Sequence, residues 1–250
     1  MRKRSKSAYL AALEKLKTLV PRFKPEKIMT DYEGAEQNAL AEAFPNAEVH
    51  GCLFHYSKAI GTNARKLGMY KVMKKSPHVR SLVRWLSCLL LLPMDYIRKG
   101  FRIITRRAIK KRVSHHLVGL QGYWMRTWHP KLHLLSVSGC ADRTSNASES
   151  DNRALQDSVP VKRPNVWDFI DGVIEMEDST YLTIKVLDRP GNVTRSRPLS
   201  AVSNDRTIKA LTEELQGGFI SVRRFLKVAS YTTLKSLNRG LNGKKRRRNI

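Results

Sequence analysis

Two acidic residues have the character needed for phosphoryl-transfer chemistry. Asp31 directly follows a short apolar run, and Glu149 lies much later in the chain. Two-metal phosphoryl transfer uses several carboxylates, about three, that converge on Mg²⁺ or Mn²⁺. A structural alternative exists for Asp31, because Thr30 and Glu33 have the spacing of a helix capping box. Asn146 and Glu149 have the same spacing, so the residue types leave both interpretations open.

A second group with chemical potential is Cys52-x-x-His55, which begins 21 residues after Asp31. Thiol and imidazole groups are zinc ligands, but this pair supplies two where a structural zinc site needs four. His50 lies nearby, but it shares a face with Cys52 only if both residues belong to the predicted strand. Packing of Cys52 and a hydrogen bond from His55 form the structural alternative.

The elements around Asp31 alternate between helix and strand. Apolar spacing predicts a helix over 7–20, a short strand over 26–30 and a helix over 32–44. A second strand over 47–54 and a helix over 55–67 follow. Two strands joined by a helix favour a right-handed parallel unit. Asp31 then stands at a carboxyl end of the sheet, where α/β proteins usually carry functional groups.

The charge indicates a polyanionic partner. The chain has 250 residues with 47 Lys+Arg against 21 Asp+Glu, a net charge of +26. Between Val49 and Ala141 there are 18 basic residues and one acid, Asp95, where a solvated surface normally mixes both signs. A field of this kind recruits nucleic acid. DNA is therefore the expected partner.

Residues 69–138 keep a helical period and are predicted to form a basic helical insertion. Within it, Ile97, Phe101, Ile104 and Ala108 form one apolar stripe of an amphipathic helix. The cationic positions of that helix are Arg98, Lys99, Arg102, Arg106, Arg107, Lys110 and Lys111. Trp124 and Trp128 lie late in the insertion, where they either stack on DNA bases or fill its core.

The C-terminal part is also predicted to be helical. Helices are expected over 146–159 and 165–178, the second with Val166, Ile170, Val173, Ile174, Trp167 and Phe169 in a core. Residues 188–202 have a loop-like composition, and helices follow over 205–216 and 219–229. The basic run 244–248 is either a nuclear import signal or a nonspecific phosphate contact.

Several protein classes are disfavoured. Cys52, Cys88 and Cys140 have no paired short spacing, so neither a disulfide framework nor a Cys-rich zinc module is expected, and a reducing compartment fits best. Charged residues interrupt the N-terminal apolar segment, so it does not have the continuous apolar core of a signal peptide. The apolar run 86–92 is too short for a bilayer, which needs roughly twenty residues. Neither secretion nor a membrane partner is expected.

Several strings together resemble the transposases of Mutator-like elements, the MULE transposase domain, over about residues 7 to 177. They are Ile28–Glu33, Phe44–Ala47, Gly51–Tyr56 and Arg143–Asn146 with Glu149. The resemblance implies a ribonuclease H-like fold with a DDE triad and a helical insertion between its second and third acids. Such enzymes cut DNA at transposon ends and join the 3′-ends to target DNA, using Mg²⁺ or Mn²⁺.

Carried to this chain, the resemblance implies roles for four residues. Asp31 corresponds to the second acid and Glu149 to the third, so both are expected to be catalytic metal ligands. Cys52 and His55 correspond to the family's Cys/Asp-x-x-His signature. The acids before Asp31 are Glu14 and Glu26. Neither suits the first acid, so the first strands of the sheet are expected to be missing.

The predicted fold class is therefore α/β: an incomplete ribonuclease H-like core with a large basic helical insertion and a helical C-terminal region. The expected divisions are a partial core over 1–68, the insertion over 69–138, a return to the core over 139–180 and a helical region over 181–250. The leading hypothesis is a truncated transposase that binds DNA in the nucleus, or in the cytoplasm of a prokaryote, and does not cleave it alone. A domesticated, non-catalytic DNA- or chromatin-binding protein is the alternative, with a partial gene product of no folded function as a third. Homo-oligomerisation is left open.

Overall fold

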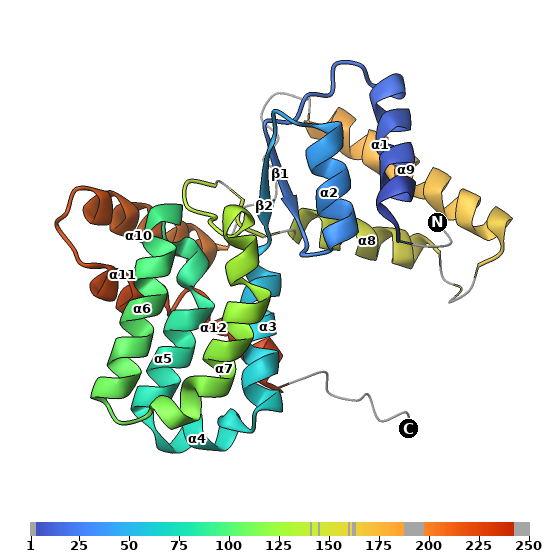
Figure 1. Ribbon diagram of the computed structural model, residues 1–250. Helices are drawn as coiled ribbons and strands as arrows, with labels where there is room; N and C mark the ends of the chain where they lie inside the picture. Colours follow the sequence, from blue (N-terminus) through green and yellow to red (C-terminus); the bar gives the residue numbers. More distant parts are fainter. Residues whose placement is uncertain are drawn as a thin grey trace. The chain divides into compact units, whose positions relative to one another are not determined.

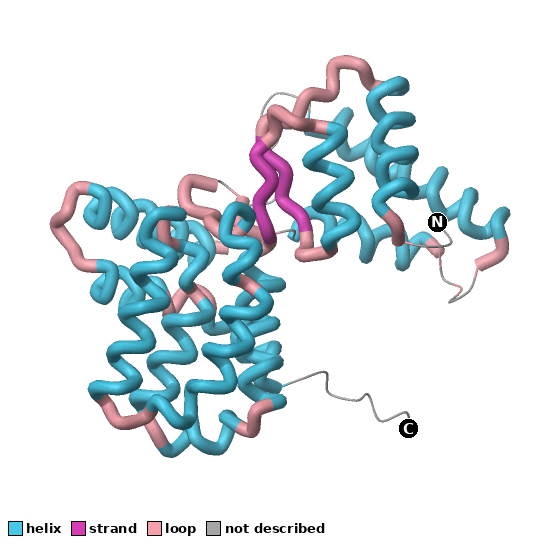
Figure 2. Tube along the Cα trace, in the orientation of Figure 1, coloured by secondary structure: helices cyan, strands magenta, loops and turns pink. Residues whose placement is uncertain are grey.

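The structure is a computed structural model that describes residues 4–140, 142–144, 146–159, 161, 164–187 and 198–242 (Figure 1). Of residues 146–149 and 151 it describes the backbone alone. The chain divides into two compact units. One comprises Met1–Thr144 with Asn204–Ile250, and the other comprises Ser145–Ser203. The described secondary structure is mostly helical, with one small sheet (Figure 2).

The first unit begins with the predicted alternation of helix and strand. Its elements in order are α1 (Lys6–Leu19), β1 (Lys27–Thr30), α2 (Gly34–Ala43), β2 (Glu48–Gly51) and α3 (Leu53–Lys66). The two strands pair in parallel, with Lys27 opposite Glu48 and Thr30 opposite Gly51. The predicted parallel unit is thus confirmed, and both strands end at the same edge. Ser5 caps α1 by accepting a hydrogen bond from the Ala8 amide at 3.3 Å, and α1 packs on α2.

A helical body follows in the same unit. It consists of α4 (Met69–Lys75), α5 (Pro77–Ser87), the 3₁₀ turn η1 (Leu89–Leu91), α6 (Met94–Lys110), α7 (Ser114–Thr127) and the 3₁₀ segment η2 (His129–Leu134). Ser76 caps α5, whose first residue is Pro77. The apolar run 86–92 is buried throughout and forms the centre of the core. Its hydrophobicity therefore serves packing within the helical body.

The C-terminal helices complete this core. α10 (Leu199–Gln216), α11 (Val222–Ala229) and α12 (Leu234–Asn242) follow one another, and the last two belong to the first unit. Val222, Phe225, Leu226 and Ala229 of α11 are buried at helical spacing. The predicted loop over 188–202 is wrong at its end, because α10 begins at Leu199; residues 188–197 lie outside the described residues. Apolar side chains at Ile208, Leu211 and Leu215 stabilise α10 against the core.

The second unit contains α8 (Asn146–Ser158) and α9 (Val166–Leu187), which pack on each other. Both helices were expected, although α9 continues nine residues beyond the predicted end at 178. The expectation that its apolar residues face a core is wrong. Trp167 is 72% exposed, and Val166, Phe169, Ile170, Val173 and Ile174 are exposed as well. Within this unit the polar helix α8 is the neighbour of α9, and Gly172 is the buried position of α9.

The α/β class is confirmed in a coarse form, as a mainly helical chain with a two-stranded parallel sheet. The ribonuclease H-like core remains a prediction, because two strands do not establish it. The four expected domain boundaries also remain predictions. None of the helices in the described ranges combines the length and apolar composition that a membrane span requires. Cys52, Cys88 and Cys140, all described, form no disulfide.

Candidate metal centre and nucleic-acid interface

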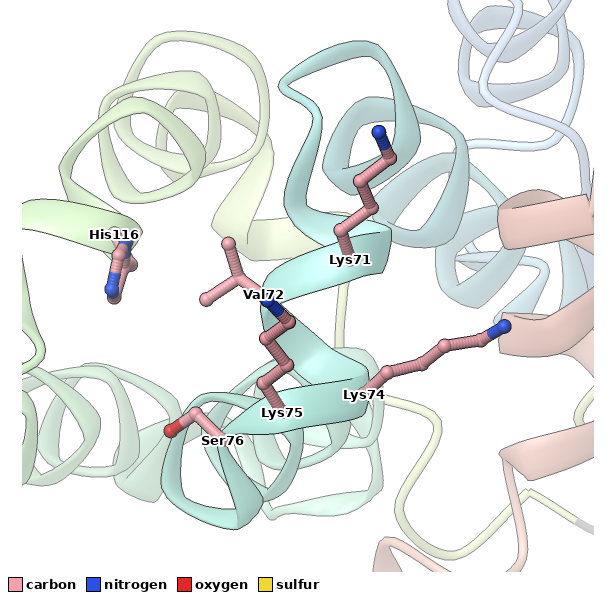
Figure 3. A pocket seen from close by; sticks show the side chains of 6 residues that line it. All are labelled: Lys71, Val72, Lys74, Lys75, Ser76 and His116. Carbon is pink, nitrogen blue, oxygen red and sulfur yellow. The ribbon is translucent and has the colours of Figure 1, made fainter.

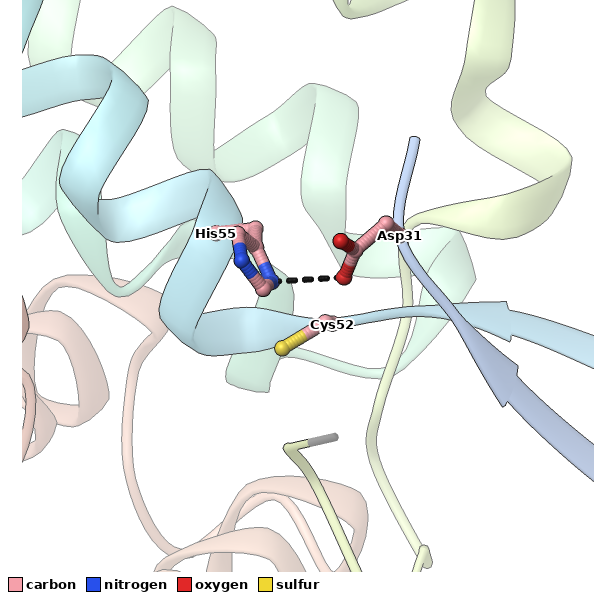
Figure 4. Close-up of side chains that lie close together, drawn as sticks. All are labelled: Asp31, Cys52 and His55. Carbon is pink, nitrogen blue, oxygen red and sulfur yellow. Dashed lines mark ion pairs between the residues drawn. The ribbon is translucent and has the colours of Figure 1, made fainter. Parts of the chain in front are cut away.

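Asp31, Cys52 and His55 meet at the carboxyl edge of the small sheet (Figure 4). Asp31 directly follows β1, and Cys52 stands between the end of β2 and the start of α3. His55 lies in the first turn of α3. Because β1 and β2 pair in parallel, both strands end at this edge. The Cys52 amide extends the pairing by one more hydrogen bond, which it donates to the Thr30 carbonyl at 2.9 Å.

The three side chains are close enough to share one ligand. His55 Nδ1 lies 2.7 Å from Asp31 Oδ1, which is hydrogen-bond distance. One potential ligand atom from each residue lies within 4.8 Å of the others. The Cys52 side chain is fully buried, whereas the side chains of His55 and Asp31 are 28% and 51% exposed. The cluster is therefore open to solvent on the side of Asp31 and closed behind Cys52.

The loop from β1 to α2 is held by polar contacts around Asp31. Gln37 Nε2 donates to the Asp31 carbonyl at 2.9 Å, and Thr30 Oγ1 donates to Glu36 at 2.7 Å. Helix α2 begins at Gly34 with Glu33 at the N-cap position, where no side-chain cap is found among the described residues. The capping-box interpretation of Thr30 and Glu33 is thus wrong. The side-chain contacts of Thr30 and Gln37 instead fix the backbone that carries Asp31.

Tyr32 packs behind the cluster. Its ring meets Trp128 edge to face at a centroid distance of 4.6 Å and lies directly against Gly51. A Cβ atom at Gly51 would overlap the Tyr32 ring, so the close approach requires glycine. Burial raises the pKa of the Tyr32 phenol well above its usual range, and the nearby Cys52 and Asp31 add to this rise. Tyr32 therefore remains a neutral phenol at neutral pH.

Glu149, the expected third acid, belongs to α8, but its side chain lies outside the described residues. Its convergence with Asp31 remains a prediction. Among the described side chains, Asp31, Cys52 and His55 form the group able to share a metal, and no group of three carboxylates occurs. Mg²⁺ takes oxygen ligands, whereas two of these three donors are sulfur and nitrogen. The described donor set does not fit the Mg²⁺ that the resemblance implies.

Pairing of Asp31 with Cys52 and His55 was not predicted from the sequence. The sequence indicated Cys52 and His55 as two possible zinc ligands, with His50 nearby. A usable signal existed in the strand pattern, since residues that follow two adjacent parallel strands meet at one edge. His55 forms an ion-pair contact with Asp31 at 2.7 Å, and the expected hydrogen bond from His55 remains a prediction.

A basic surface covers α6. Its apolar stripe is buried as predicted at Ile97, Ile104 and Ala108, while Phe101 is half-buried. The exposed cationic residues on the helix and just after it are Arg98, Lys99, Arg102, Arg106, Lys110 and Lys111. Four of them, at 98, 102, 106 and 110, share the i, i+4 spacing of one helix face. The amphipathic character expected for α6, with one apolar and one basic face, is confirmed.

Arg107 extends the positive charge toward α11. Its guanidinium lies over the Trp85 ring at 5.3 Å, and it is half-buried. Burial lowers the pKa of Arg107, and the positive charge of Arg223 lowers it further. Arg223 is exposed on α11, beside Arg224 and close to Lys227. Like charges thus gather where α6 and α11 pack together.

A pocket of about 480 Å³ adds a second basic feature, lined by α4, the start of α5 and His116 of α7 (Figure 3). Its cationic side chains are Lys71, Lys74 and Lys75. Ser76 and Val72 complete the lining. The lysines are exposed.

Trp124 and Trp128 do not contribute to the basic surface. They are 1% and 4% exposed, so the expectation of core packing is confirmed and base stacking is not supported. Trp124 stacks on Phe101 at a centroid distance of 4.1 Å and donates from Nε1 to the Tyr56 hydroxyl at 3.0 Å. Both indoles therefore fix the helical body to α3.

Comparison with known families identifies the N-terminal segment. The family model described as MULE transposase domain matches residues 1–59, a range that contains Asp31, Cys52 and His55. The match ends within α3, before the helical body begins. No curated protein and no solved structure gives a match. Residues 1–59, with both strands and the start of α3, are therefore similar to the MULE transposase domain.

Proposed function

We propose that this transposase-related chain binds DNA through the basic surface of its helical body. The observation that carries the proposal is the imbalance of charge: 18 basic residues against one acid over 49–141. None of the 18 forms an ion pair with an acid in the described part of the chain. An uncompensated cationic surface of this kind favours phosphate contacts and the release of bound counterions.

The basic face of α6 suits a polyanion more than a single phosphate. The helix has 17 residues and is therefore roughly 25 Å long. Its exposed cations recur once per turn, so they can meet successive phosphates of one DNA strand. Arg107 and Arg223 widen the same surface toward α11. Contacts of this type bind the backbone without reading sequence.

A triple substitution on α6 tests this surface. R98Q, R102Q and R106Q together should weaken binding to a fixed DNA duplex, measured by fluorescence anisotropy over a salt series. Each lost phosphate contact should reduce the magnitude of the slope of log K against log salt by about 0.9, so the triple variant should lose roughly 2 to 3.

The matched control removes the same charge elsewhere. Lys15, Arg22 and Lys24 are exposed in and after α1, and K15Q, R22Q and K24Q together also lower the net charge by three. This control should retain most of the affinity and the salt slope. Equal losses in the two triple variants would show that net charge alone, and not the α6 face, determines binding.

The second part of the proposal is that the chain does not cleave DNA on its own. Strand transfer with Mg²⁺ or Mn²⁺, which the match to the MULE transposase domain suggests, needs several carboxylates, and Asp31 is the one described acid in the cluster. A supercoiled plasmid should therefore remain intact with either ion. Nicking that requires Mg²⁺ or Mn²⁺ and disappears in D31A would contradict this expectation and support Asp31 as a catalytic acid.

The proposal also locates the protein with DNA, which means the nucleus for a eukaryotic source. The basic run 244–248, expected to act in import or in phosphate contact, lies outside the described residues. A fluorescent fusion with and without this run tests the import role. Nuclear accumulation that does not change after its removal would assign the run to DNA contact instead.

A further inference from the structure

We infer that Asp31, Cys52 and His55 form a zinc-binding site, separate in chemistry from the magnesium pair expected of a DDE enzyme. The inference rests on the geometry of the cluster and does not depend on DNA binding by α6. It concerns residues from two places in the fold: Asp31 directly after β1, and Cys52 with His55 at the start of α3.

The donor atoms match Zn²⁺ by type. A thiolate, an imidazole nitrogen and a carboxylate oxygen are the three ligand classes that zinc uses in proteins. Mg²⁺ requires oxygen ligands in an octahedral arrangement, and it would leave the Cys52 sulfur and the His55 nitrogen unused. Sites with sulfur and nitrogen donors select zinc and related transition metals.

The number of protein ligands distinguishes structural zinc sites from sites with an open position. Structural zinc sites usually have four protein ligands, while three protein ligands leave a fourth position for water or a substrate atom. The half-exposed Asp31 side chain leaves this fourth position on the solvent side of the site. The buried Cys52 closes the opposite side. An ion can therefore enter past Asp31 without opening the core.

The distances require a small adjustment. Typical zinc bond lengths place tetrahedral ligand atoms about 3.4 to 3.7 Å apart. The His55 Nδ1 to Asp31 Oδ1 distance is 2.7 Å, and all three ligand atoms lie within 4.8 Å of one another. Rotation of Asp31, which has the greatest exposure of the three, can widen the ion-paired contact and make room for the ion between the two side chains.

The backbone around the cluster is well supported. The Cys52 amide donates to Thr30, and the Leu53 amide donates to the Arg143 carbonyl at 3.0 Å. The Tyr56 amide donates to the Cys52 carbonyl at 3.1 Å and completes the first turn of α3. Cys52 and His55 are thus three residues apart at a helix start, a spacing that directs both side chains to one face. Little reorganisation of the chain is needed to bind an ion.

An orphaned polar atom lies next to the cluster. The Tyr32 hydroxyl is buried and has no hydrogen-bond partner among the described residues. Buried polar groups usually have a partner, so a missing one indicates an additional ligand or water.

The test uses the full chain with Zn²⁺ alone, and Co²⁺ as a spectroscopic probe. Calorimetry of the metal-free protein should show one Zn²⁺ per chain, with no comparable binding of Mg²⁺. Co²⁺ should give the charge-transfer absorption of a cobalt–thiolate bond. Since loss of an outer-shell partner weakens metal sites by about 10 to 100-fold, loss of a direct ligand in C52S or D31N should weaken Zn²⁺ binding by at least that factor.

C140S is the matched control, because Cys140 is a partly exposed thiol outside the cluster. It should retain both the stoichiometry and the cobalt–thiolate band. Circular dichroism identifies any variant that does not fold, and D31N changes an exposed side chain, so it provides a test even if C52S is unstable. Absence of Zn²⁺ binding in the wild type, a band that survives in C52S, or full affinity in D31N would each overturn the site. DNA affinity of the α6 variants is measured without Zn²⁺, so the two proposals fail independently.

Discussion

At the scale of single residues, Tyr56 connects three helices through one hydroxyl group. It is completely buried on α3, accepts a hydrogen bond from Trp124 Nε1 at 3.0 Å and donates to the Leu86 carbonyl at 2.8 Å. Its ring also meets Trp128 at a centroid distance of 4.9 Å. The segment that carries the MULE match is joined in this way to the helical body that follows it.

Replacement of this tyrosine by phenylalanine tests the hydroxyl alone. Y56F keeps the ring but leaves the buried Trp124 N–H without its acceptor, and it removes one bond to Leu86. The expected loss in the free energy of unfolding is about 2 to 3 kcal/mol, measured by urea denaturation. The control Y231F changes an exposed tyrosine and should stay within about 0.5 kcal/mol of wild type. An equally small effect of Y56F would mean that water replaces the lost bonds.

At the scale of elements, the contact between α3 and α12 depends on two glycines. Gly61 of α3 lies against Gly240 of α12, where a Cβ on Gly61 would stand 3.1 Å from the Gly240 Cα. A Cβ on Gly240 would overlap the Lys58 carbonyl and lie 2.8 Å from the Thr62 amide. The obstacles are backbone atoms, which cannot rotate away as a side chain can. The two helices can therefore approach closely because neither glycine carries a side chain.

A valine at this crossing should separate the helices. G240V is expected to reduce the free energy of unfolding by about 3 kcal/mol or more, because overpacking against backbone cannot relax locally. Thermal unfolding followed by circular dichroism measures the loss. G34A is the control, since a Cβ there meets nothing within 4 Å at the start of α2, and it should be neutral or stabilising by up to about 1 kcal/mol. Similar melting of G240V and wild type would refute the close crossing.

At the scale of the whole molecule, the buried phenols set an upper pH limit for stability. Burial raises the pKa of Tyr56 and of Tyr32 well above the usual value of about 10. Below pH 10 both phenols are neutral whether the chain is folded or unfolded, so their full contribution to the free energy of unfolding is present. Above pH 10 the unfolded chain ionises first, and stability falls as the pH rises toward the folded-state pKa values.

This linkage predicts cooperative alkaline unfolding. The helical circular dichroism signal should decrease above pH 10 together with the late appearance of phenolate absorbance from the buried tyrosines. If all eight tyrosines ionise near pH 10 while the helical signal persists, the buried environment of Tyr56 and Tyr32 is incorrect.

The sequence by itself determined the order of helices and strands at the N-terminus, the amphipathic character of α6 and the excess of positive charge. These features depend on local spacing and composition, which a linear pattern contains. The MULE resemblance was also accessible from strings of residues, and the family match confirms it over residues 1–59. The end of α9 and the start of α10 were missed, although Pro190 and Gly191 follow the first and Pro198 directly precedes the second.

Only the tertiary structure decided which residues share a site. Asp31 joins Cys52 and His55 because the parallel register of β1 and β2 brings their carboxyl ends to one edge, and periodicity along the chain does not contain that register. Burial of Trp124 and Trp128 and exposure of Trp167 were decided in the same way, by the neighbours each helix acquires in its own unit. An apolar residue requires a partner surface to be buried, and spacing within one helix cannot specify that partner.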